Sequence, residues 1–464
     1  MLWFHEALRY TCVDCWIWIG KVLQAGILEK PSIGSCPRST QSLSWTEPTV
    51  VKPLILLAVT VIALIGAMTY SARLRRIAET APKLAIAADP TSVVLLDDSA
   101  TGATVSVIIP AYNEAENIEA CVRSVLQNTT LSAEQLDVWV VDDQSSDATL
   151  TIAQTLQQTL NDPRLRVLAG KPRPKNEIWV GKNWACVQAS TQSTGAFLLF
   201  LDADVRLKPG AIVAAVKTAE QTEADLLSVC PRVVCGCLTE WLVQPILVNQ
   251  LLANLDFAAV AEPQTDAVFA AGPFMLFRRT AYDQIGGHKG VANQVVEDVE
   301  LARRIKQSGL RLLLLLGNDV ADLRMYRSFA TLWEGWTKNL YLGTQRNLKA
   351  LVIFALTMLT LYTAPWFGFI FVLCKAAIDT LTMVDVMTFG VALAAILLHY
   401  DIRRLGGNVS AIPTRYWWLT GVGGALVAAI AIASIIKTET GWGWTWRGRA
   451  LQLPNANSDV EGKK

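Results

Sequence analysis

Three acidic motifs provide most of the chemistry that this amino-acid sequence could perform. The first is Asp202-Ala203-Asp204, which directly follows an apolar run at residues 196–201. Two carboxylates at the end of a strand, with a small residue between them, can bind a hard divalent cation such as Mg²⁺ or Mn²⁺. A cation held there would neutralise charge on a departing diphosphate. Aspartate is also common in solvated turns, so this motif alone is weak evidence.

The second motif is Asp142-Asp143, which follows a β-rich run at residues 138–141. Its carboxylates can accept hydrogen bonds from the N–H group of a nucleobase and from ribose hydroxyls. Asp147, a few residues later, is a candidate N-cap for a helix that begins near Ala148. We therefore expect the helix to use Asp147, which leaves Asp142 and Asp143 for a ligand.

The third motif is Glu297-Asp298, at the start of an expected helix over residues 296–308. The helix dipole favours ionised carboxylates in a first turn. An ionised carboxylate at the mouth of a site can act as general base toward an alcohol. Charged residues are commonplace in first turns, however, so this motif also needs support from its surroundings.

Alternating elements must position these motifs. From about Ala103 to Gly343, short β-rich runs alternate with amphipathic helical stretches. This alternation predicts an α/β layer with a largely parallel sheet, and ligands of such sheets bind beyond the carboxyl ends of the strands. All three motifs fall at such places. The expected strands cover residues 105–109, 138–141 and 196–201, and the expected helices cover residues 114–126, 209–220 and 296–308.

The composition indicates a membrane protein. Of 464 residues, 52% are hydrophobic and only 17% are charged, which is apolar for a soluble protein. The net charge of +1 gives no global field that would attract nucleic acid, so we expect no nucleic-acid partner. Nine scattered cysteines and three histidines favour free thiols over a disulfide framework or a zinc site.

The apolar excess is concentrated in four stretches. Residues 54–70 are uncharged and long enough to cross a bilayer, and arginines at 73, 75 and 76 mark their C-terminal end as cytoplasmic. Three further transmembrane helices are expected. The expected segments are an N-terminal region of unknown role at 1–50, a linker at 71–103, transmembrane helices at 54–70, 350–374, 386–400 and 417–436, and a polar tail at 437–464.

The direction of the last helix is left open by the sequence. Four spans and a cytoplasmic catalytic domain would put the C-terminus outside, although the tail carries Arg447, Arg449, Lys463 and Lys464. Either the 350–374 segment is broken or re-entrant, or the charge rule fails here.

The order of the motifs adds a resemblance. The chain carries Pro110-Ala111-Tyr112-Asn113-Glu114, the Asp142 cluster, Gly181-Lys182, Asp202-Ala203-Asp204, Gly272-Pro273-Phe274 and Glu297-Asp298, in that sequence. This series resembles the large family-2 glycosyltransferases, which are inverting enzymes with the Rossmann-like GT-A fold of nucleotide-diphospho-sugar transferases. The resemblance covers residues 104–342, roughly half of the chain.

The resemblance implies a role for each matching residue. Mg²⁺ or Mn²⁺ is the implied cofactor, and a nucleotide-sugar, with UDP favoured, is the implied donor. The implied donor-binding residues are Pro110, Ala111, Glu114, Asp142, Asp143, Lys182 and Asp202; the metal ligands are Asp204 and Asp202; the base is Asp298 beside Glu297; and Gly272 lines the acceptor side.

One departure from the family pattern bears on the product. Processive synthases of this family carry a Q/R-x-x-R-W signature after the acidic pair, and here that stretch contains Tyr326-Arg327-Ser328 and then Trp333 and Trp336. The chain is therefore expected to add one sugar to each acceptor. The stretch is similar to a membrane-anchored bacterial subgroup linked with hopanoid and carotenoid pathways, as are Gly286-Gly287-His288 and Trp446-Arg447-Gly448-Arg449.

The aromatic pair after the departure suggests where the acceptor enters. Trp333 and Trp336 lie three residues apart on an expected helix and could rest at the bilayer interface or pack against the catalytic domain. Arg327 or Lys338 in the same region could reach the departing diphosphate. The resulting expectation is transfer of one sugar to a membrane lipid, such as a hopanoid, carotenoid or glycerolipid, at the cytoplasmic face of the plasma membrane.

Two other functions remain as alternatives. A processive polysaccharide synthase would need a channel through the membrane, and the few spans count against it. A non-catalytic scaffold could keep the glycosyltransferase fold, although such a protein would be expected to lose its carboxylates first.

Overall fold

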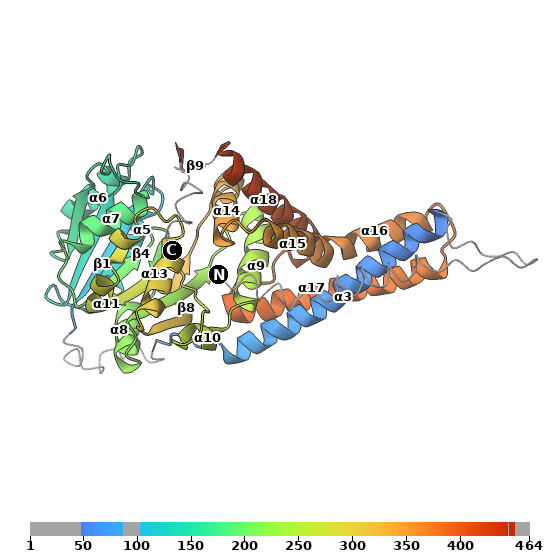
Figure 1. Ribbon diagram of the computed structural model, residues 1–464, viewed down its shortest axis with the longest axis horizontal. Coiled ribbons are helices and arrows are strands. Elements are labelled where there is room, and N and C mark those ends of the chain that lie inside the picture. The colour runs from blue at the N-terminus through green and yellow to red at the C-terminus, as the bar shows by residue number, and fades with distance from the viewer. Residues whose placement is uncertain (1–47, 87–102, 444, 451–464) are drawn as a thin grey trace, which may run out of the picture.

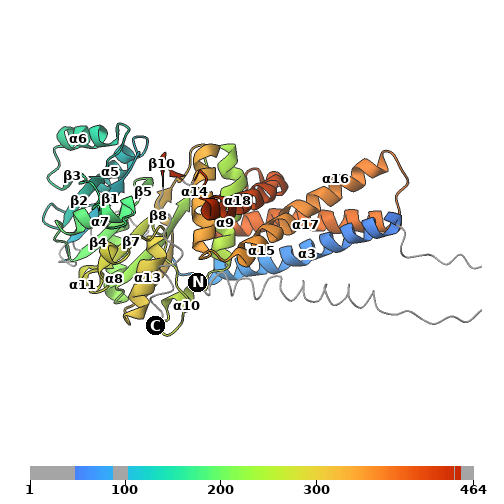
Figure 2. The ribbon, with the colours of Figure 1, turned by 45° about the horizontal axis from the view of Figure 1, so that its top comes forward.

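The computed structural model describes residues 48–86, 103–443 and 445–450. A mixed α/β domain forms one end of the molecule, and long helices project from it as a narrow bundle (Figure 1). Two helices, α9 (Leu238–Ala253) and α14 (Phe329–Gly343), lie between the sheet and the bundle (Figure 2). Residues 1–47 of the expected N-terminal segment, 87–102 of the expected linker and 451–464 of the expected polar tail fall outside the described residues.

An eight-stranded sheet organises the α/β domain, with spatial order β3-β2-β1-β4-β7-β6-β8-β5. The β3-β2-β1-β4 half is parallel, as expected. The other half is mixed: β6 pairs parallel with β8, whereas β7 pairs antiparallel with both β4 and β6, and β5 pairs antiparallel with β8. The expectation of a largely parallel sheet is therefore wrong for β7 and β5. The strands are β1 (Val105–Ala111), β2 (Leu136–Asp142), β3 (Leu165–Ala169), β4 (Phe197–Leu201), β5 (Val205–Leu207), β6 (Leu226–Val233), β7 (Phe274–Arg278) and β8 (Leu312–Leu323).

Helices cover both faces of the sheet, which explains why its central strand is apolar throughout. In β4, Leu199 and Leu201 pack toward α5, α6 and α8, whereas Leu198 and Phe200 pack toward α7, α10, α11 and α13. The helices of this domain are α5 (Ile118–Gln127), α6 (Thr149–Leu160), α7 (Gly181–Ser190), α8 (Ala211–Gln221), α10 (Phe257–Ala261), α11 (Arg279–Gln284), α12 (Gly287–Gly290) and α13 (Glu297–Gln307).

Among the described residues, four helices are long and apolar enough to cross a membrane, by length and composition. The first, α3 (Pro48–Thr80), continues well into the expected linker, since residues 71–80 are largely good helix formers. The second consists of α15 (Leu348–Met358) and α16 (Ala364–Ala376), joined by a π-helical turn, Leu359–Thr363, just before Pro365. The third is α17 (Met383–Ser410), and the fourth is α18 (Thr420–Thr440) with the 3₁₀ turn before it, Trp417–Leu419.

The last two helices end on the same side. Near the end of α17 the carbonyl oxygen of Val409 accepts a hydrogen bond from Asn318 Nδ2 of the sheet, at 2.8 Å. The chain then turns back, and Trp417 contacts the ring of Tyr400 in α17, with centroids 5.3 Å apart. From there α18 runs back toward the catalytic domain, where the hydroxyl of Ser434 accepts a hydrogen bond from the backbone N–H of Tyr341 in α14. The C-terminal ends of α17 and α18 therefore both lie beside the catalytic domain.

Candidate active site

The three acidic motifs meet at one edge of the sheet. Asp142 ends β2 opposite Ala111 of β1, and Asp202 follows β4, the other neighbour of β1. Lys182, in the first turn of α7, joins two of the motifs: its Nζ lies 2.7 Å from Asp202 Oδ1 and 2.8 Å from Glu297 Oε1. Burial disfavours the charged ammonium, but the two carboxylates outweigh it and hold the pKa of Lys182 above its ordinary value.

Asp298 is held by backbone N–H groups. Its Oδ2 accepts a hydrogen bond from Gly272 N at 3.0 Å, and its Oδ1 accepts one from Val299 N at 2.8 Å. A Cβ atom at position 272 would lie 2.9 Å from Asp298 Oδ2, so the close approach requires glycine. Gly272, expected on the acceptor side, therefore directly positions the expected base.

The pKa of Asp298 is higher than expected for a carboxylate in the first turn of a helix, which was expected to be fully ionised. Burial, followed by repulsion from Glu297, raises it to about 7, although two backbone N–H groups oppose the shift. The neighbouring Glu297 behaves in the opposite way: burial opposes its charge, but Lys182 more than compensates and lowers its pKa. Glu297 is thus a fixed anion paired with Lys182, whereas Asp298 can exchange a proton near neutral pH.

The Asp202-Ala203-Asp204 motif offers one carboxylate that the protein does not satisfy. Oδ1 of Asp204 is buried and has no hydrogen-bond partner in the described part of the chain. Burial, with repulsion from Glu114 and Asp202, raises the pKa of Asp204 well above its ordinary value. A buried oxygen without a donor suits a hard cation, so Asp204 and Asp202 fit the expected Mg²⁺ or Mn²⁺. Within the described residues no group of three or more His, Cys, Asp or Glu side chains could hold a metal by itself.

The expected donor-binding residues line the loops after β1 and β2. Pro110 and Ala111 end β1, and the helix expected from residue 114 begins only at Ile118, which leaves Glu114 in the loop. Burial raises the pKa of Glu114, whose Oε2 accepts a hydrogen bond from Asn117 Nδ2 at 2.8 Å.

The second acidic motif is buried on the same side. Asp142 Oδ2 accepts a hydrogen bond from Ser145 N, while its Oδ1 is buried without a partner among the residues described. Asp147 behaves nearly as expected: the N-cap of α6 is Ala148, but the Asp147 carboxylate accepts the N–H of Thr149 at 2.9 Å. Asp142 and Asp143 are therefore not used by the helix.

Two arginines at the end of the described chain complete this side, and no local sequence pattern predicts their position. The Nη2 of Arg447 lies 2.7 Å from Glu114 Oε1, and Arg449 forms an ion pair with Asp143. Both residues were expected only as part of a polar tail with a family-like pattern. The signal in the sequence was a Trp-Arg-Gly-Arg turn, but nothing local relates it to motifs more than 300 residues earlier.

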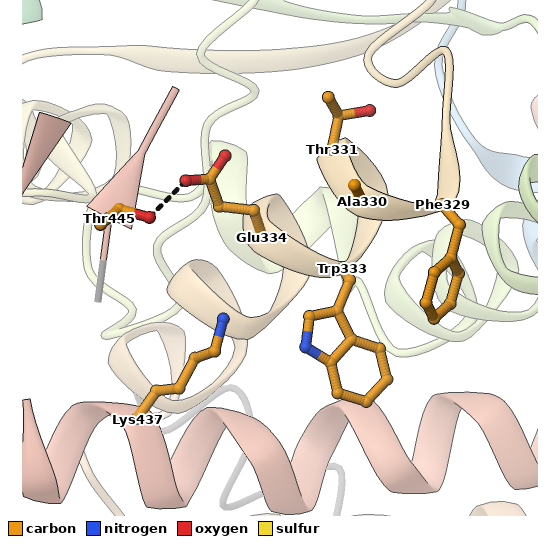
Figure 3. A pocket seen from close by; sticks show the side chains of 7 residues that line it. All are labelled: Phe329, Ala330, Thr331, Trp333, Glu334, Lys437 and Thr445. Carbon is orange, nitrogen blue, oxygen red and sulfur yellow. Dashed lines mark hydrogen bonds between the residues drawn. The ribbon is translucent and has the colours of Figure 1, made fainter. Parts of the chain in front are cut away.

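The helix that carries the aromatic pair lies beside an open pocket of about 570 Å³ (Figure 3). Trp333 lines this pocket, whereas the Nε1 of Trp336 donates to Gln244 Oε1 of α9 at 2.9 Å. Both rings also pack against the same apolar cluster of the helical part. The pocket is lined by Phe329, Ala330, Thr331, Trp333, Glu334, Lys437 and Thr445.

The two cations expected near the diphosphate lie differently. Arg327 is turned toward α5, where its Nη2 donates to Asn117 Oδ1 at 2.8 Å. Lys338 is turned toward Trp446, with its Nζ 4.0 Å from the ring centroid. Burial lowers the pKa of Lys338 to about 8, against the opposing charges of Glu297, Asp202 and Asp298.

Part of this chain is similar to known proteins. Residues 106–286 match glycosyl transferase family 2. The chain is 27% identical over 259 residues to a 4,4′-diaponeurosporenoate glycosyltransferase of Staphylococcus haemolyticus, a match that covers 54% of this chain and 66% of that protein. A Staphylococcus aureus protein of the same name is 29% identical over 254 residues, 53% of this chain and 64% of that protein. The matches span less than two thirds of these relatives.

A solved structure gives a weaker match. The mannosyltransferase PcManGT from Pyrobaculum calidifontis, in complex with GDP-Man and Mn²⁺, is 20% identical and covers 83% of this chain and 98% of its own, with a TM-score of 0.49. The family match and the mixed sheet with its apolar helices confirm the fold class expected from the motifs, an α/β GT-A domain flanked by long apolar helices. One stretch of the chain, residues 106–286, is thus similar to glycosyl transferase family 2, the enzyme class that its motifs indicate.

Proposed function

We propose that this protein is an inverting, metal-dependent glycosyltransferase that moves one sugar from a nucleotide-sugar, with UDP favoured, to a hydroxyl group of a membrane lipid. The observation that carries the proposal is the contrast between Glu297 and Asp298. Glu297 is an anion tied by Lys182 to Asp202, whereas Asp298 has a pKa of about 7 and is held by Gly272. A base that can take a proton thus lies next to the expected diphosphate site.

Each residue then has a task in the transfer. Asp298 accepts the proton of the acceptor hydroxyl, and the oxygen of that hydroxyl attacks the anomeric carbon of the sugar. The nucleoside diphosphate leaves from the opposite face, which inverts the configuration. Lys182, which pairs with Asp202 and Glu297, would donate to the diphosphate and neutralise part of its charge. A bound Mg²⁺ or Mn²⁺, held by Asp204 and Asp202, would neutralise charge on the departing group.

The donor side consists of the loops after β1 and β2. Pro110, Ala111 and Glu114 would border the nucleotide from β1, and Asp142 and Asp143 would accept hydrogen bonds from base and ribose. The unpartnered Oδ1 of Asp142 supports this assignment, because a buried acceptor without a donor is costly unless a ligand supplies one.

The acceptor side is proposed at the pocket between α14 and α18. Phe329 and Trp333 offer apolar contacts, and Lys437, in the last turn of α18, offers a cation to a polar or acidic group. Glu334 in the pocket and Lys338 near the acidic centre are four residues apart on α14 and so share one face of the helix. The relatives are named for 4,4′-diaponeurosporenoate, which agrees with an extended apolar acceptor of the carotenoid class.

The same arrangement supports an orientation in the plasma membrane. Arg75 and Arg76 are exposed at the end of α3 nearest the catalytic domain, as is typical of a cytoplasmic end. Because α18 returns to the catalytic domain, Arg447 and Arg449 would lie on the cytoplasmic side as well. The conflict between the number of spans and the tail charges then disappears.

The decisive experiment compares membrane lipids from cells that express the wild-type protein with those that express Asp298→Asn. Mass spectrometry should find a lipid heavier by one hexose only with the wild type. An identical lipid profile would favour the scaffold, and a series of longer glycans would favour the processive synthase.

A further inference from the structure

A short hairpin follows α18 and reaches the donor side of the site. It consists of β9 (Thr445–Trp446) and β10 (Arg449–Ala450), in which Arg449 pairs with Trp446. The two residues of its loop, Arg447 and Gly448, both have positive φ angles, 49° and 80°. This is the pattern of a two-residue hairpin turn, for which glycine is suited and arginine is not. Arg447 is therefore held in an unfavourable conformation by its contacts.

Arg449, in the second strand of the hairpin, contacts both Tyr112 and Asp143. Its guanidinium lies over the ring of Tyr112, with Cζ 3.8 Å from the ring centroid, and pairs with the carboxylate of Asp143. Its Nη2 also donates to the backbone oxygen of Asp143 at 2.9 Å. A Cβ atom at Gly181 would lie 2.1 Å from Asp143 Oδ2 and 3.1 Å from Arg449 Nη1, so the surroundings are close-packed around this pair.

The guanidinium has the recognition features of a nucleobase. It is planar, it stacks on an aromatic face, and its edge presents N–H donors to a carboxylate. A uracil or guanine ring would use the same features, with an N–H edge toward Asp143. Arg449 and a base cannot both occupy the same carboxylate and the same face of Tyr112.

Arg447 covers the neighbouring part of the site. Its guanidinium pairs with Glu114 and donates to the carbonyl oxygens of Tyr112 and Asn113. In return, Asn113 Nδ2 donates to the carbonyl oxygen of Arg447 at 3.2 Å. The hairpin thus covers the loop after β1, which contains Glu114, one of the residues assigned to the donor.

The other strand of the hairpin is fixed independently to α14. Thr445 Oγ1 donates to Glu334 Oε1 at 2.5 Å, the N–H of Arg447 donates to Glu334 Oε2 at 3.1 Å, and Lys338 lies over the ring of Trp446. Release of Arg449 from Asp143 therefore does not require release of β9 from α14. Because Glu334 and Thr445 also line the pocket beside Trp333, the anchor of the hairpin is shared with the proposed acceptor side.

We propose that this hairpin is a built-in plug of the donor site, with Arg449 in the place of the nucleobase, and that the donor must displace it to bind. The inference rests on the proposed function, because it assumes that Asp143 and Glu114 serve a nucleotide. A closed site would keep water and wrong anions away from the buried carboxylates until a donor arrives. The apparent donor affinity is then lower than the intrinsic one by the fraction of molecules that are open.

The test measures nucleotide affinity in the full-length protein in nanodiscs. UDP and GDP, each with Mg²⁺, are titrated calorimetrically into the wild type, Arg449→Ala, Arg449→Lys and the control Arg123→Ala, which removes an exposed pair on α5. We expect Arg449→Ala to bind the preferred nucleotide on the order of tenfold more tightly and Arg449→Lys to show a smaller gain, because lysine keeps the charge but loses the plane. Arg123→Ala should match the wild type.

A second measurement does not depend on the fold of a variant. Trypsin cleaves after Arg447 and Arg449, and addition of the preferred nucleotide to the wild-type protein should accelerate cleavage at both bonds. Wild-type binding without a gain in Arg449→Ala, or protection of these bonds by nucleotide, would overturn the plug and leave the proposed function standing. If neither nucleotide binds any of the proteins, both the proposed function and the plug fail.

Discussion

Glu297 and Asp298 are neighbours in sequence, yet the pKa values of their carboxyl groups are shifted in opposite directions. Lys182 lies 2.8 Å from Glu297 and holds its pKa low, whereas burial and the charge of Glu297 raise the pKa of Asp298 to about 7. Pairs of carboxyl groups whose environments separate their pKa values in this way can divide their tasks between a fixed charge and a proton acceptor. This relationship decides which of the two residues should respond to mutation as the base.

Replacement of the base should separate chemistry from binding. Asp298→Asn keeps the size of the side chain but cannot accept a proton, so kcat should fall by about a hundred- to ten-thousandfold. Donor affinity should hold within a few-fold, because Asp298 faces Gly272 on the acceptor side. Single-turnover rates and calorimetric donor affinities of the same preparation check both parts. Wild-type turnover in Asp298→Asn would make Glu297 the next residue to test.

The raised pKa of Asp298 predicts the pH dependence of the reaction. A general base works only in its deprotonated form, so the rate should rise with pH and level off above about pH 7. Below that value the rate should fall tenfold for each pH unit. Initial rates in buffers from pH 5 to 8.5, with the stability of the protein checked at each pH, test the sign. A rate that falls across this range would show that the titrating group must be protonated instead.

The unpartnered oxygen of Asp204 predicts metal dependence. EDTA should abolish turnover, and Mg²⁺ or Mn²⁺ should restore it. Asp204→Asn should lower kcat by on the order of a thousandfold, because charge stabilisation of this kind contributes several kcal/mol. Asp162→Asn is a matched control, since that aspartate pairs with Arg164 away from the site. Undiminished turnover in the chelator would remove the metal from the mechanism.

The missing R-W signature predicts the length of the product. Each acceptor should carry one added sugar even at long reaction times and high donor concentration. Thin-layer chromatography of the lipid products with a radiolabelled donor distinguishes a single spot from a ladder. A ladder would restore the interpretation as a processive synthase.

The sequence predicted the part of the fold that local patterns encode. Acidic residues directly after apolar runs placed Asp142 and Asp202 at strand ends, and the parallel pairing of β2, β1 and β4 brings them to one edge. The reversed direction of β7 could not be predicted, because alternation along a strand is the same in either direction. The local charge of Asp298 was predicted, but its burial depends on the whole domain.

The position of the C-terminal hairpin was beyond the sequence for a different reason. Arg449 and Asp143 are separated by 306 positions, and their contact follows from the return of α18 to the catalytic domain. Hydropathy identifies α18 as long and apolar enough to cross a membrane, but it carries no information on the depth at which the helix begins. The position at which α18 begins relative to α17 is set by contacts such as the one between Trp417 and Tyr400.

The direction of the helices predicts which surfaces face the cytoplasm. Thr194 is exposed on the catalytic domain, and Ile378 is 86% exposed in the connection between α16 and α17, at the far end of the bundle. In a Cys374→Ser background, which removes an exposed thiol near that connection, each position is replaced by cysteine. A membrane-impermeant maleimide added to intact cells should label Ile378→Cys and leave Thr194→Cys unlabelled until the cells are opened. Nucleotide-sugars are supplied from the cytoplasm, so labelling of Thr194→Cys in intact cells would reverse the orientation and remove the donor supply that the proposed function requires.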